Sequence, residues 1–250
     1  MVADYPSLAS FPSPFDAVVF GASGGIGRAF VEALAVDPAV ATVTAVSRRP
    51  TDWASPRVVP LVADLLDEAS IAAAAEACRP RPPRLVIVAT GVLHGEDLRP
   101  EKSLQELDPA RLARVFAINA TGPALVLKHF APLLPRTGKA VVAALSARVG
   151  SISDNHLGGW YAYRASKAAL NQLVRTAAIE VGRRWREACI VGLHPGTVAT
   201  PLSGPFRGNV APGKLFSPAQ SAGHLLAVID RLAPADSGRC FAWDGSIVDP

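Results

Sequence analysis

A tyrosine and a lysine four residues apart, Tyr163 and Lys167, are the pair best suited to acid–base chemistry. Apolar residues recur at three- and four-residue steps from Ala165 onward, which predicts a helix. Residues four apart share one helix face, so the phenol and the ammonium are expected side by side. The nearby positive charge would lower the pKa of the phenol and suit it to proton transfer near neutral pH. The same spacing also occurs on ordinary exposed helix faces, so the pair needs support from the rest of the chain.

A glycine-rich turn near the N-terminus predicts a nucleotide site. Its sequence, GASGGIG, lies directly after an apolar run at residues 17–20 and directly before a helical pattern at residues 26–35. Glycines let the backbone approach a pyrophosphate, and the following helix N-terminus favours its negative charge. Glycines also serve tight packing, but the place between a strand and a helix favours nucleotide binding. The candidate binding residues of the turn are Gly21, Ser23, Gly25, Ile26 and Gly27.

Two arginines follow the second predicted strand, where an enzyme specific for NAD often carries an acidic residue for the ribose 2′-hydroxyl. The sequence at this strand end is Val46-Ser47-Arg48-Arg49, without an acid. Guanidinium groups form charge-assisted, often bidentate hydrogen bonds with phosphate. We therefore expect NADP(H) to be preferred over NAD(H), with a solvated basic loop as the alternative.

The elements that must position these residues alternate between strands and helices. Such alternation, with near-continuous apolar strands, indicates a mostly parallel sheet covered on both faces. The predicted fold class is α/β, a doubly wound Rossmann sheet of seven strands in a single domain over residues 1–250, with ligands at the carboxyl ends of the strands. We expect strands at residues 17–20, 40–46, 57–62, 85–88, 139–145, 188–193 and 239–243, and helices at 26–35, 67–77, 110–134 (interrupted at 122–123), from 165 and after 217.

Two segments are expected to be less regular. Residues 1–14, with three prolines, predict a loosely ordered lead-in. Residues 201–216 have the Pro and Gly composition of a mobile loop, and we expect a substrate lid there.

The composition limits the class of protein. Half of the 250 residues are apolar and 18% are charged, so a folded core is expected. The net charge of +4 is spread out without interleaved aromatic residues, which argues against nucleic-acid binding. We find no run long enough to span a bilayer and no signal-peptide pattern. Three scattered cysteines fit a reducing cytoplasm, and the five histidines lack metal-ligand spacing, so we expect no metal site.

Together these features resemble the short-chain dehydrogenase/reductase family, and the resemblance covers nearly the whole chain. The family's motifs occur in the family's order. Within the family, residues 153–161, the run YRASKAALN and residues 194–201 and 241–245 are similar to the C-factor-like branch. The matching motif residues are Gly21, Gly25 and Gly27 (G-x-x-x-G-x-G), Ser146, and Tyr163 and Lys167 (Y-x-x-x-K).

The resemblance implies roles for four matching residues. Tyr163 would give a proton to a carbonyl or take one from an alcohol, and Lys167 would lower its pKa and hold the nicotinamide ribose. Ser146 would hydrogen-bond the reacting oxygen, and Asn119 would anchor a water in the proton relay. Hydride arriving at a carbonyl carbon builds negative charge on oxygen, which fixed hydroxyl donors stabilise. By residue type alone, Ser146 could instead be a turn residue, and Asn119 could satisfy a backbone group freed near Gly122-Pro123.

The resemblance also implies further cofactor contacts. Asp64 and Leu65, after the third strand, match the family's contact with the adenine edge, although Asp64 could also be a turn or cap residue. Pro195, Val198 and Thr200 match the segment that packs on the nicotinamide carboxamide.

The sequence departs from the family's usual pattern in three places. Val88-Ala89-Thr90-Gly91 replaces the usual Asn-Asn-Ala-Gly, so Gly91 remains as the close-approach position while the bracing amides are absent. Phe20 stands where a threonine usually precedes the first glycine, and the stretch between Ser146 and Tyr163 is longer than in many members. None of these changes removes a residue of the catalytic set.

The predicted function is NADP(H)-dependent hydride transfer between nicotinamide and a carbonyl or secondary alcohol, with Tyr163 as the acid/base. Leu202, Phe206, Val210 and Leu215 in the expected lid suggest an apolar substrate, although they could also pack the lid down. The alternative is an NADP-binding signalling or regulatory protein of the C-factor type. A homodimer or homotetramer is expected from small residues on the Tyr163 helix, which would permit close approach: Ala165, Ala168, Ala169, Ala177 and Ala178.

Overall fold

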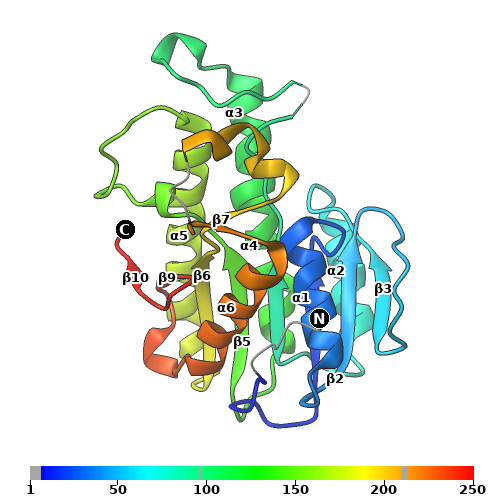
Figure 1. Cartoon of the computed structure of the whole chain (residues 1–250). Helices are drawn as coiled ribbons and strands as arrows, with labels where there is room; N and C mark the ends of the chain where they lie inside the picture. The colour runs from blue at the N-terminus through cyan, green and yellow to red at the C-terminus, as the bar shows by residue number, and fades with distance from the viewer. Residues whose placement is uncertain (1–6, 96, 210–212) are drawn as a thin grey trace.

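An eight-stranded sheet forms the centre of the computed structural model, which describes residues 7–95, 97–209 and 213–250 (Figure 1). The strand order is β10-β9-β6-β5-β4-β1-β2-β3, and all neighbours are parallel except β9 and β10. The strands are β1 (Phe15–Phe20), β2 (Val40–Ser47), β3 (Val58–Val62), β4 (Leu85–Val88), β5 (Ala140–Leu145), β6 (Ala188–His194), β9 (Cys240–Ala242) and β10 (Ile247–Val248).

This topology confirms the predicted doubly wound α/β fold. The chain runs outward from β1 to β3 and then crosses to β4 on the other side of β1. A switch point therefore lies between β1 and β4, where folds of this kind bind ligands. All seven predicted strands are present. The eighth, β10, has two residues and runs antiparallel at the sheet edge, and a strand this short leaves no readable alternation in the sequence.

Helices cover both faces of the sheet (Figure 1). One core cluster joins the sheet to α1 (Gly25–Val36) and α6 (Pro218–Arg231), and the other joins it to α2 (Glu68–Cys78), α4 (Gly122–Phe130) and α5 (Tyr161–Gly182). Strand β5 illustrates the division, because its alternate residues point to opposite faces. Val141, Ala143 and Leu145 belong to the first cluster, and Ala140, Val142 and Ala144 belong to the second.

Shorter elements complete the fold. The strands β7 (Thr197–Val198) and β8 (Leu215–Phe216) pair in parallel outside the main sheet and bring together the two ends of the expected lid. Ser217 and Gln220 form a capping box at the start of α6, the helix predicted after residue 217. The remaining helical segments are α3 (Pro109–Phe116), η1 (Leu104–Glu106), η2 (Ala117–Thr121), η3 (Ala131–Leu133), η4 (Arg148–Gly150), η5 (Pro201–Asn209) and η6 (Pro234–Asp236).

The long helix predicted over residues 110–134 does not break at Gly122-Pro123. The chain passes from α3 through η2, one wide turn of π-helix, directly into α4. Pro123 lacks the N–H that would bond to the Asn119 carbonyl four residues earlier, and the widened turn lies immediately before it. A Cβ at Gly122 would lie 2.8 Å from the Leu65 Cβ, so glycine lets this helix pack closely on the turn after β3.

Residues 7–14 are packed, which corrects the prediction of a loosely ordered lead-in for that part of the segment. Leu8 and Phe11 are buried in the core cluster on the α1 and α6 face. The Leu8 N–H donates to the Asp37 carboxylate at 2.8 Å, and the Ser10 N–H donates to the Asp230 carboxylate at 2.9 Å. The burial of two large apolar side chains outweighs the proline content on which the prediction depended.

Three further observations bear on the class of protein. No helix in the described ranges is long and apolar enough to cross a membrane. Cys78, Cys189 and Cys240 are all buried and unpaired. Within the same ranges, no group of three His, Cys, Asp or Glu side chains is arranged to hold a metal ion.

Candidate active site

The glycine-rich turn connects β1 to α1 at the switch point and leaves a helix N-terminus without a side-chain cap. Gly24 occupies the cap position, with no capping hydrogen bond and no acidic residue in the first turn of α1. The first N–H groups of a helix need partners, and an anion can supply them. Gly21 has a φ of +79°, and a Cβ at Gly27 would lie 2.1 Å from the Gly21 carbonyl oxygen. The turn therefore requires glycine at both positions, and Ser23 is exposed between them.

The residues that follow β4 lie directly against the glycine-rich turn. A Cβ at Gly21 would lie 2.8 Å from the Ala89 carbonyl oxygen, so the turn rests directly on this segment. The Thr90 hydroxyl is buried there and has no hydrogen-bond partner within the described protein. A Cβ at Gly91 would lie 3.7 Å from Lys167 Nζ. The absence of a side chain at Gly91 therefore leaves the space between the turn and the lysine unfilled. An orphaned hydroxyl, open glycines and an uncapped helix fit an extended phosphate-containing cofactor.

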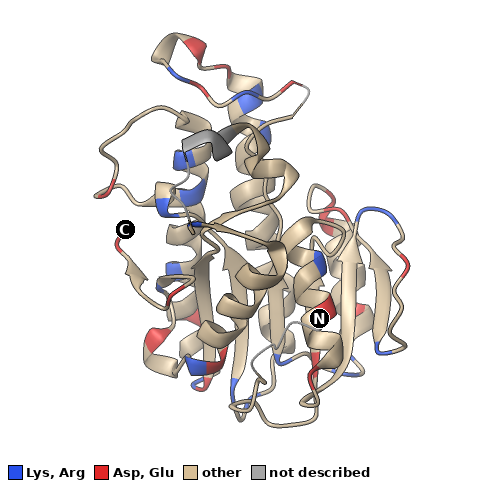
Figure 2. Cartoon of the chain, in the orientation of Figure 1, with Lys and Arg blue, Asp and Glu red and all other residues tan. Residues whose placement is uncertain are grey.

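Arg48 and Arg49 lie exposed in the loop after β2, at the carboxyl edge of the sheet. Figure 2 shows Lys and Arg on many parts of the chain, including a loop at the upper right of the sheet. The Ser47 hydroxyl donates to the Arg49 carbonyl at 2.6 Å and fixes the turn that presents them. Asp64 takes part in a turn after β3, because its Oδ1 accepts the Leu66 N–H at 3.0 Å. The turn role that the sequence left open for Asp64 is therefore observed, and its role toward adenine remains a prediction.

Tyr163 and Lys167 share one face of α5, as the spacing predicts, and Lys167 Nζ lies 5.9 Å from the centre of the Tyr163 ring. The helix begins at Tyr161, earlier than the predicted start at Ala165. Lys167 is 2% exposed, and its Nζ donates to the Leu145 carbonyl, at the end of β5, at 2.7 Å. The strand end thus fixes the lysine directly below the crevice.

The pKa shift predicted for the tyrosine is wrong in direction. Burial raises the pKa of Tyr163 to about 12, because loss of water disfavours the phenolate. Burial also lowers the pKa of Lys167 to about 8. At neutral pH the phenol is therefore protonated, which is the state that a proton donor requires.

Ser146 follows β5 directly and is 3% exposed. Its N–H donates to the Leu193 carbonyl at 2.7 Å, which extends the pairing of β5 with β6 by one residue. Its hydroxyl donates to Asn171 Oδ1 at 2.7 Å. Ser146 is thus the next residue after the one whose carbonyl holds Lys167, and both are fixed by the same strand end.

Asn119 is fully buried in η2, and its side chain acts as a brace. Its Oδ1 accepts the Val92 N–H at 2.8 Å, and its Nδ2 donates to the Val92 carbonyl at 2.9 Å and to Ser166 Oγ at 3.1 Å. The Ser166 hydroxyl in turn donates to the Tyr163 carbonyl at 2.8 Å. The amide therefore ties the segment after β4 to the tyrosine helix. The backbone groups that it satisfies belong to Val92 and not to the helix near Gly122-Pro123.

The segment with Pro195, Val198 and Thr200 crosses the glycine-rich turn. A Cβ at Gly25 would lie 2.7 Å from the Thr200 methyl carbon, and Val198 and Thr200 are both buried. The Ser221 hydroxyl on α6 donates to the Pro195 carbonyl at 2.9 Å. The predicted nicotinamide segment thus stands next to the predicted phosphate turn.

The expected lid begins with η5 and ends at β8. Leu202 is half-buried and Leu215 is 41% exposed. The side chain of Phe206 and all of Val210 lie outside the described residues.

Four residues near the site were not predicted from the sequence. Asn171 lies four residues after Lys167, so the same helical spacing that pairs Tyr163 with Lys167 could have found it. Thr90 was noted only as a departure, and its orphaned hydroxyl has no signal in the sequence. Glu101 and Cys240 come near the site through tertiary contacts alone: the Glu101 carboxylate accepts the Ala162 N–H at 3.1 Å, and Cys240 Sγ would lie 3.2 Å from a Cβ at Gly192 on β6.

Comparison with known proteins extends this description. The family model described as short chain dehydrogenase matches residues 16–210. The chain is 40% identical over 146 residues to the C-signal of Myxococcus xanthus, which covers 58% of this chain and 82% of that protein. It is 36% identical over 142 residues to the 1-hydroxy-2-glutathionyl-2-methyl-3-butene dehydrogenase of Rhodococcus sp. (strain AD45), which covers 57% of this chain and 60% of that protein.

Solved structures agree. The NADPH-bound carbonyl reductase from chicken fatty liver matches with a TM-score of 0.81 and 27% identity, over 96% of this chain and all of that chain. A carbonyl reductase from Pseudomonas aeruginosa PAO1 matches with a TM-score of 0.76 and 26% identity, over 94% of this chain and all of that one. Because the family model covers well over half of the sequence, the chain belongs to the short-chain dehydrogenase/reductase family, as a member similar to the C-factor-like branch.

Proposed function

We propose that this oxidoreductase moves hydride between NADP(H) and the carbonyl or secondary alcohol carbon of a small molecule. The observation that carries the proposal is the arrangement at the end of β5. There the Leu145 carbonyl holds Lys167 at 2.7 Å, the next residue is Ser146, and the protonated Tyr163 stands one helical turn from the lysine. This is a proton donor and a hydroxyl donor at the carboxyl edge of a sheet whose switch point fits a dinucleotide.

The assignment of NADP(H) over NAD(H) depends on Arg48 and Arg49. Their exposed guanidinium groups follow β2, where a 2′-phosphate would be recognised by charge. The chicken carbonyl reductase, 27% identical, binds NADPH. When bound, this cofactor supplies or accepts the hydride.

The chain's own residues would handle the proton and the charge on oxygen. Tyr163 donates its proton to the oxygen during reduction and takes it back during oxidation. The ammonium of Lys167 stabilises the phenolate that forms after proton donation, and the hydroxyl of Ser146 stabilises the developing oxyanion.

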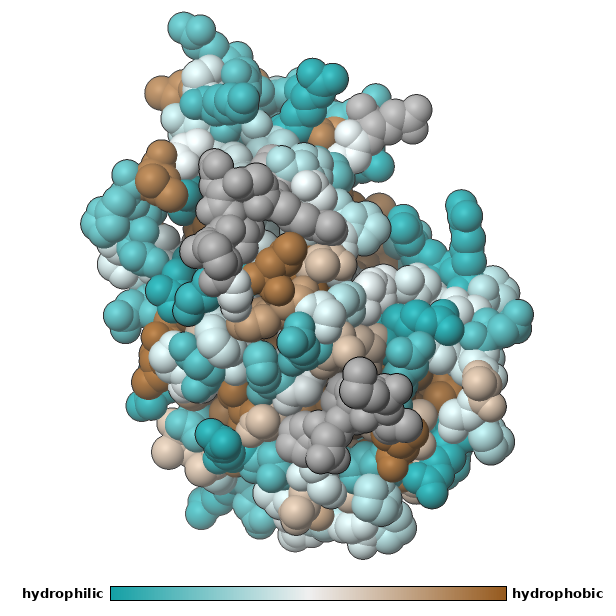
Figure 3. All heavy atoms as spheres, in the orientation of Figure 1, coloured by the Kyte–Doolittle hydropathy of each residue, from teal (hydrophilic) through white to brown (hydrophobic). Residues whose placement is uncertain are grey.

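An apolar substrate is supported by apolar side chains on the loops at the carboxyl ends of β4 and β5. Leu157 is 92% exposed and Leu104 is 68% exposed. Figure 3 shows separate hydrophobic spots in the upper part of the molecule, among hydrophilic side chains. The lid over residues 201–216 would close on this side.

A second copy of the chain is a proposed partner. Between α4 and α5 lies a surface groove that includes Ala124, Leu173 and Ala177, with Leu173 38% exposed. Small and apolar side chains of this kind permit close helix packing, which supports a homodimer or homotetramer. The buried, unpaired cysteines support a cytoplasmic location.

A signalling or regulatory role is the second candidate, and the 40% identity to the C-signal favours it. Such a role is compatible with nucleotide binding. The two candidates differ in whether the purified protein turns over a carbonyl substrate.

The test is a panel of aliphatic, aromatic and cyclic carbonyl compounds, with NADPH oxidation followed by absorbance. Turnover of at least one compound is expected, and Tyr163→Phe should lower kcat by about 100-fold or more because the proton donor is lost. Tyr161→Phe, two residues earlier on the same helix, is the control and should keep full activity. Saturable NADPH binding without any turnover would favour the signalling role, and full activity of Tyr163→Phe would contradict the proton assignment.

A further inference from the structure

The Ser146 hydroxyl is held from behind by the side chain of Asn171 on α5. Its proton goes to Asn171 Oδ1, with 2.7 Å between the oxygens. The Cys240 thiol on β9 lies beside this contact, because a Cβ at Gly192 would lie 3.2 Å from Cys240 Sγ and 3.5 Å from Asn171 Oδ1.

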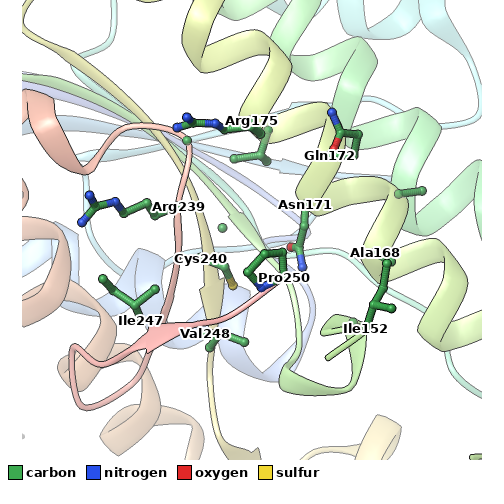
Figure 4. Close-up of a pocket in the computed structure, with 15 residues that line it drawn as sticks. Ile152, Ala168, Asn171, Gln172, Arg175, Arg239, Cys240, Ile247, Val248 and Pro250 are labelled. Carbon is green, nitrogen blue, oxygen red and sulfur yellow. The ribbon is translucent and has the colours of Figure 1, made fainter. Parts of the chain in front are cut away.

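Asn171 and Cys240 also form part of the wall of a separate cavity. The cavity has a volume of about 770 Å³ and lies between α5 and the β9–β10 pair (Figure 4). Its lining is mainly apolar, with Ile152, Ile247 and Val248 among its residues. Space therefore exists beside Asn171 for its amide to turn without displacing the packed core.

The direction of the Ser146 proton matters for the proposed reaction. A hydroxyl has one proton to donate and lone pairs to accept. While that proton is given to Asn171, it is not available for the oxygen of a substrate. An asparagine amide carries an acceptor at one end and donors at the other, so a turned amide would give an N–H to Ser146 Oγ and release the serine proton.

We propose that Asn171 is a positioning residue that sets which way the Ser146 proton points. This inference rests on the proposed carbonyl chemistry. With Asn171 Oδ1 toward Ser146, the hydroxyl is held away from the substrate. With Nδ2 toward Ser146, the hydroxyl accepts from the amide and donates to the oxyanion.

The helix makes this arrangement possible. Tyr163, Lys167 and Asn171 lie four residues apart on successive turns of α5, so they share one face. The first offers a proton, the second a positive charge and the third a reversible hydrogen bond to the serine. One rigid element thus positions three different groups around one reacting oxygen.

The test compares Asn171→Asp with Asn171→Ala. A carboxylate only accepts, so Asn171→Asp should hold the serine proton permanently and lower kcat for carbonyl reduction by about tenfold or more. Asn171→Ala frees the hydroxyl and should cost less, about threefold, by loss of preorganisation. KM for NADPH should stay within about twofold in both variants, because Asn171 does not face the nucleotide turn. If Asn171 only stabilised the fold, Asn171→Asp would not have a lower kcat than Asn171→Ala when the two variants have the same thermal stability.

The control is Gln172→Glu, which makes the same change from amide to carboxylate one residue further along α5, in the same cavity wall. It should leave kcat unchanged. In a Ser146→Ala background, both Asn171 substitutions should change residual activity by less than about twofold, because no serine proton remains to be directed. The proposal would be overturned if the Asn171 substitutions lowered kcat as much in the Ser146→Ala background as in the wild-type background, or if Asn171→Asp were as active as wild type. If Asn171→Asp does not fold, the comparison of Asn171→Ala in the two backgrounds tests the proposal.

Failure of the proposed function is distinguishable from failure of this inference. A wild-type protein that reduces no carbonyl contradicts the proposed function. The hydrogen bond is then tested by thermal unfolding of wild type, Ser146→Ala, Asn171→Ala and the double variant. Measurable coupling between the two substitutions supports the Ser146–Asn171 contact, and additive effects overturn it.

Discussion

Lys167 is a charged side chain in a position where a lysine is usually excluded. It is 2% exposed, its Nζ has the Leu145 carbonyl as a partner, and burial lowers its pKa to about 8. A buried ammonium group costs folding free energy. Such a group is therefore expected mainly where a function needs its charge. Here the charge lies near the phenol that would become negative during reduction. The proposed chemistry therefore gives a reason for burying a lysine at this position.

The pH dependence of carbonyl reduction follows from this shift. The ammonium is present below the pKa of Lys167 and is lost as pH rises through about 8, whereas the Tyr163 phenol stays protonated until about 12. We therefore expect kcat/KM to fall about tenfold per pH unit above the lysine pKa, measured between pH 6 and 10 with a neutral substrate.

Lys167→Arg is the matched variant for this measurement. A guanidinium keeps its charge across the whole range, so any activity that this variant retains should show no fall near pH 8. A wild-type profile that stays flat to pH 10 would contradict the role of the ammonium.

The candidate catalytic residues are easier to find in the sequence than the contacts that surround them. The spacing of Tyr163 and Lys167 and the place of Ser146 after a strand are one-dimensional signals, and the structure brings all three to one strand end. The direction of the Tyr163 pKa depends on how much water is removed, which is a property of the folded core. The bracing role of the Asn119 side chain depends on Val92, 27 residues away, and the sequence does not show which backbone groups need a partner.

At the scale of elements, the start of α5 is held by the loop after β4. Gly158, Gly159 and Trp160 all have positive φ, at 64°, 65° and 53°, and lead into the helix without a side-chain cap of its own. Glu101, 5% exposed, replaces that cap: its carbonyl accepts the Trp160 N–H at 2.5 Å and its carboxylate accepts the Ala162 N–H at 3.1 Å. A carboxylate at a helix N-terminus is stabilised by the helix dipole.

Removing this remote cap should loosen the first turn of the helix that carries Tyr163. Glu101→Ala is expected to lower the free energy of unfolding by about 1–2 kcal/mol, measured by urea denaturation, and to lower kcat. Glu101→Gln keeps an acceptor and should lose less. Glu106→Ala removes a carboxylate that accepts the Lys102 N–H on the exposed side of the same loop, and it should change stability by less than about 0.5 kcal/mol. Equal losses for Glu101→Ala and Glu106→Ala would contradict the capping role.

The elements themselves differ in how far sequence predicts them. Strands buried on both faces, such as β4 and β5, appear as continuous apolar runs and were found. The two-residue β10 and the packed residues 7–14 were missed, because both depend on distant partners and not on local pattern. The helix at 110–134 was expected to be interrupted at Gly122-Pro123. In the structure it continues through these residues, with one turn of π-helix immediately before them.

At the scale of the whole molecule, the crevice joins the two halves of the sheet. The glycine-rich turn and the arginine loop belong to the β1–β3 half, whereas Ser146 and the 195–200 segment belong to the β4–β6 half. A dinucleotide that spans the switch point would contact both halves at once. A ligand that binds only the folded protein stabilises it in proportion to its affinity.

Thermal unfolding can therefore compare cofactors without a substrate. At a concentration of about 100 times its dissociation constant, a nucleotide adds about 2.7 kcal/mol, so NADPH should raise Tm more than NADH at equal concentration. Neutralising Arg48 and Arg49 to alanine should remove this difference by weakening NADPH specifically.

The matched control is the pair Arg183→Ala and Arg184→Ala, which removes the same charge from exposed positions at the end of α5. It should leave the NADPH shift intact. Equal weakening of NADPH and NADH by the Arg48 and Arg49 substitutions would contradict recognition of the 2′-phosphate.

The packing of residues 7–14 also has a consequence for how the chain is made. Ser10 bonds to Asp230, 220 positions later, and Leu8 and Phe11 lie in the core cluster that includes α6. Synthesis runs from the N-terminal to the C-terminal side, so the α6 side of this cluster is made long after residues 7–14. Asp37 and the β1 and β2 members of the cluster are available early, but the packing of residues 7–14 is complete only when α6 has been made.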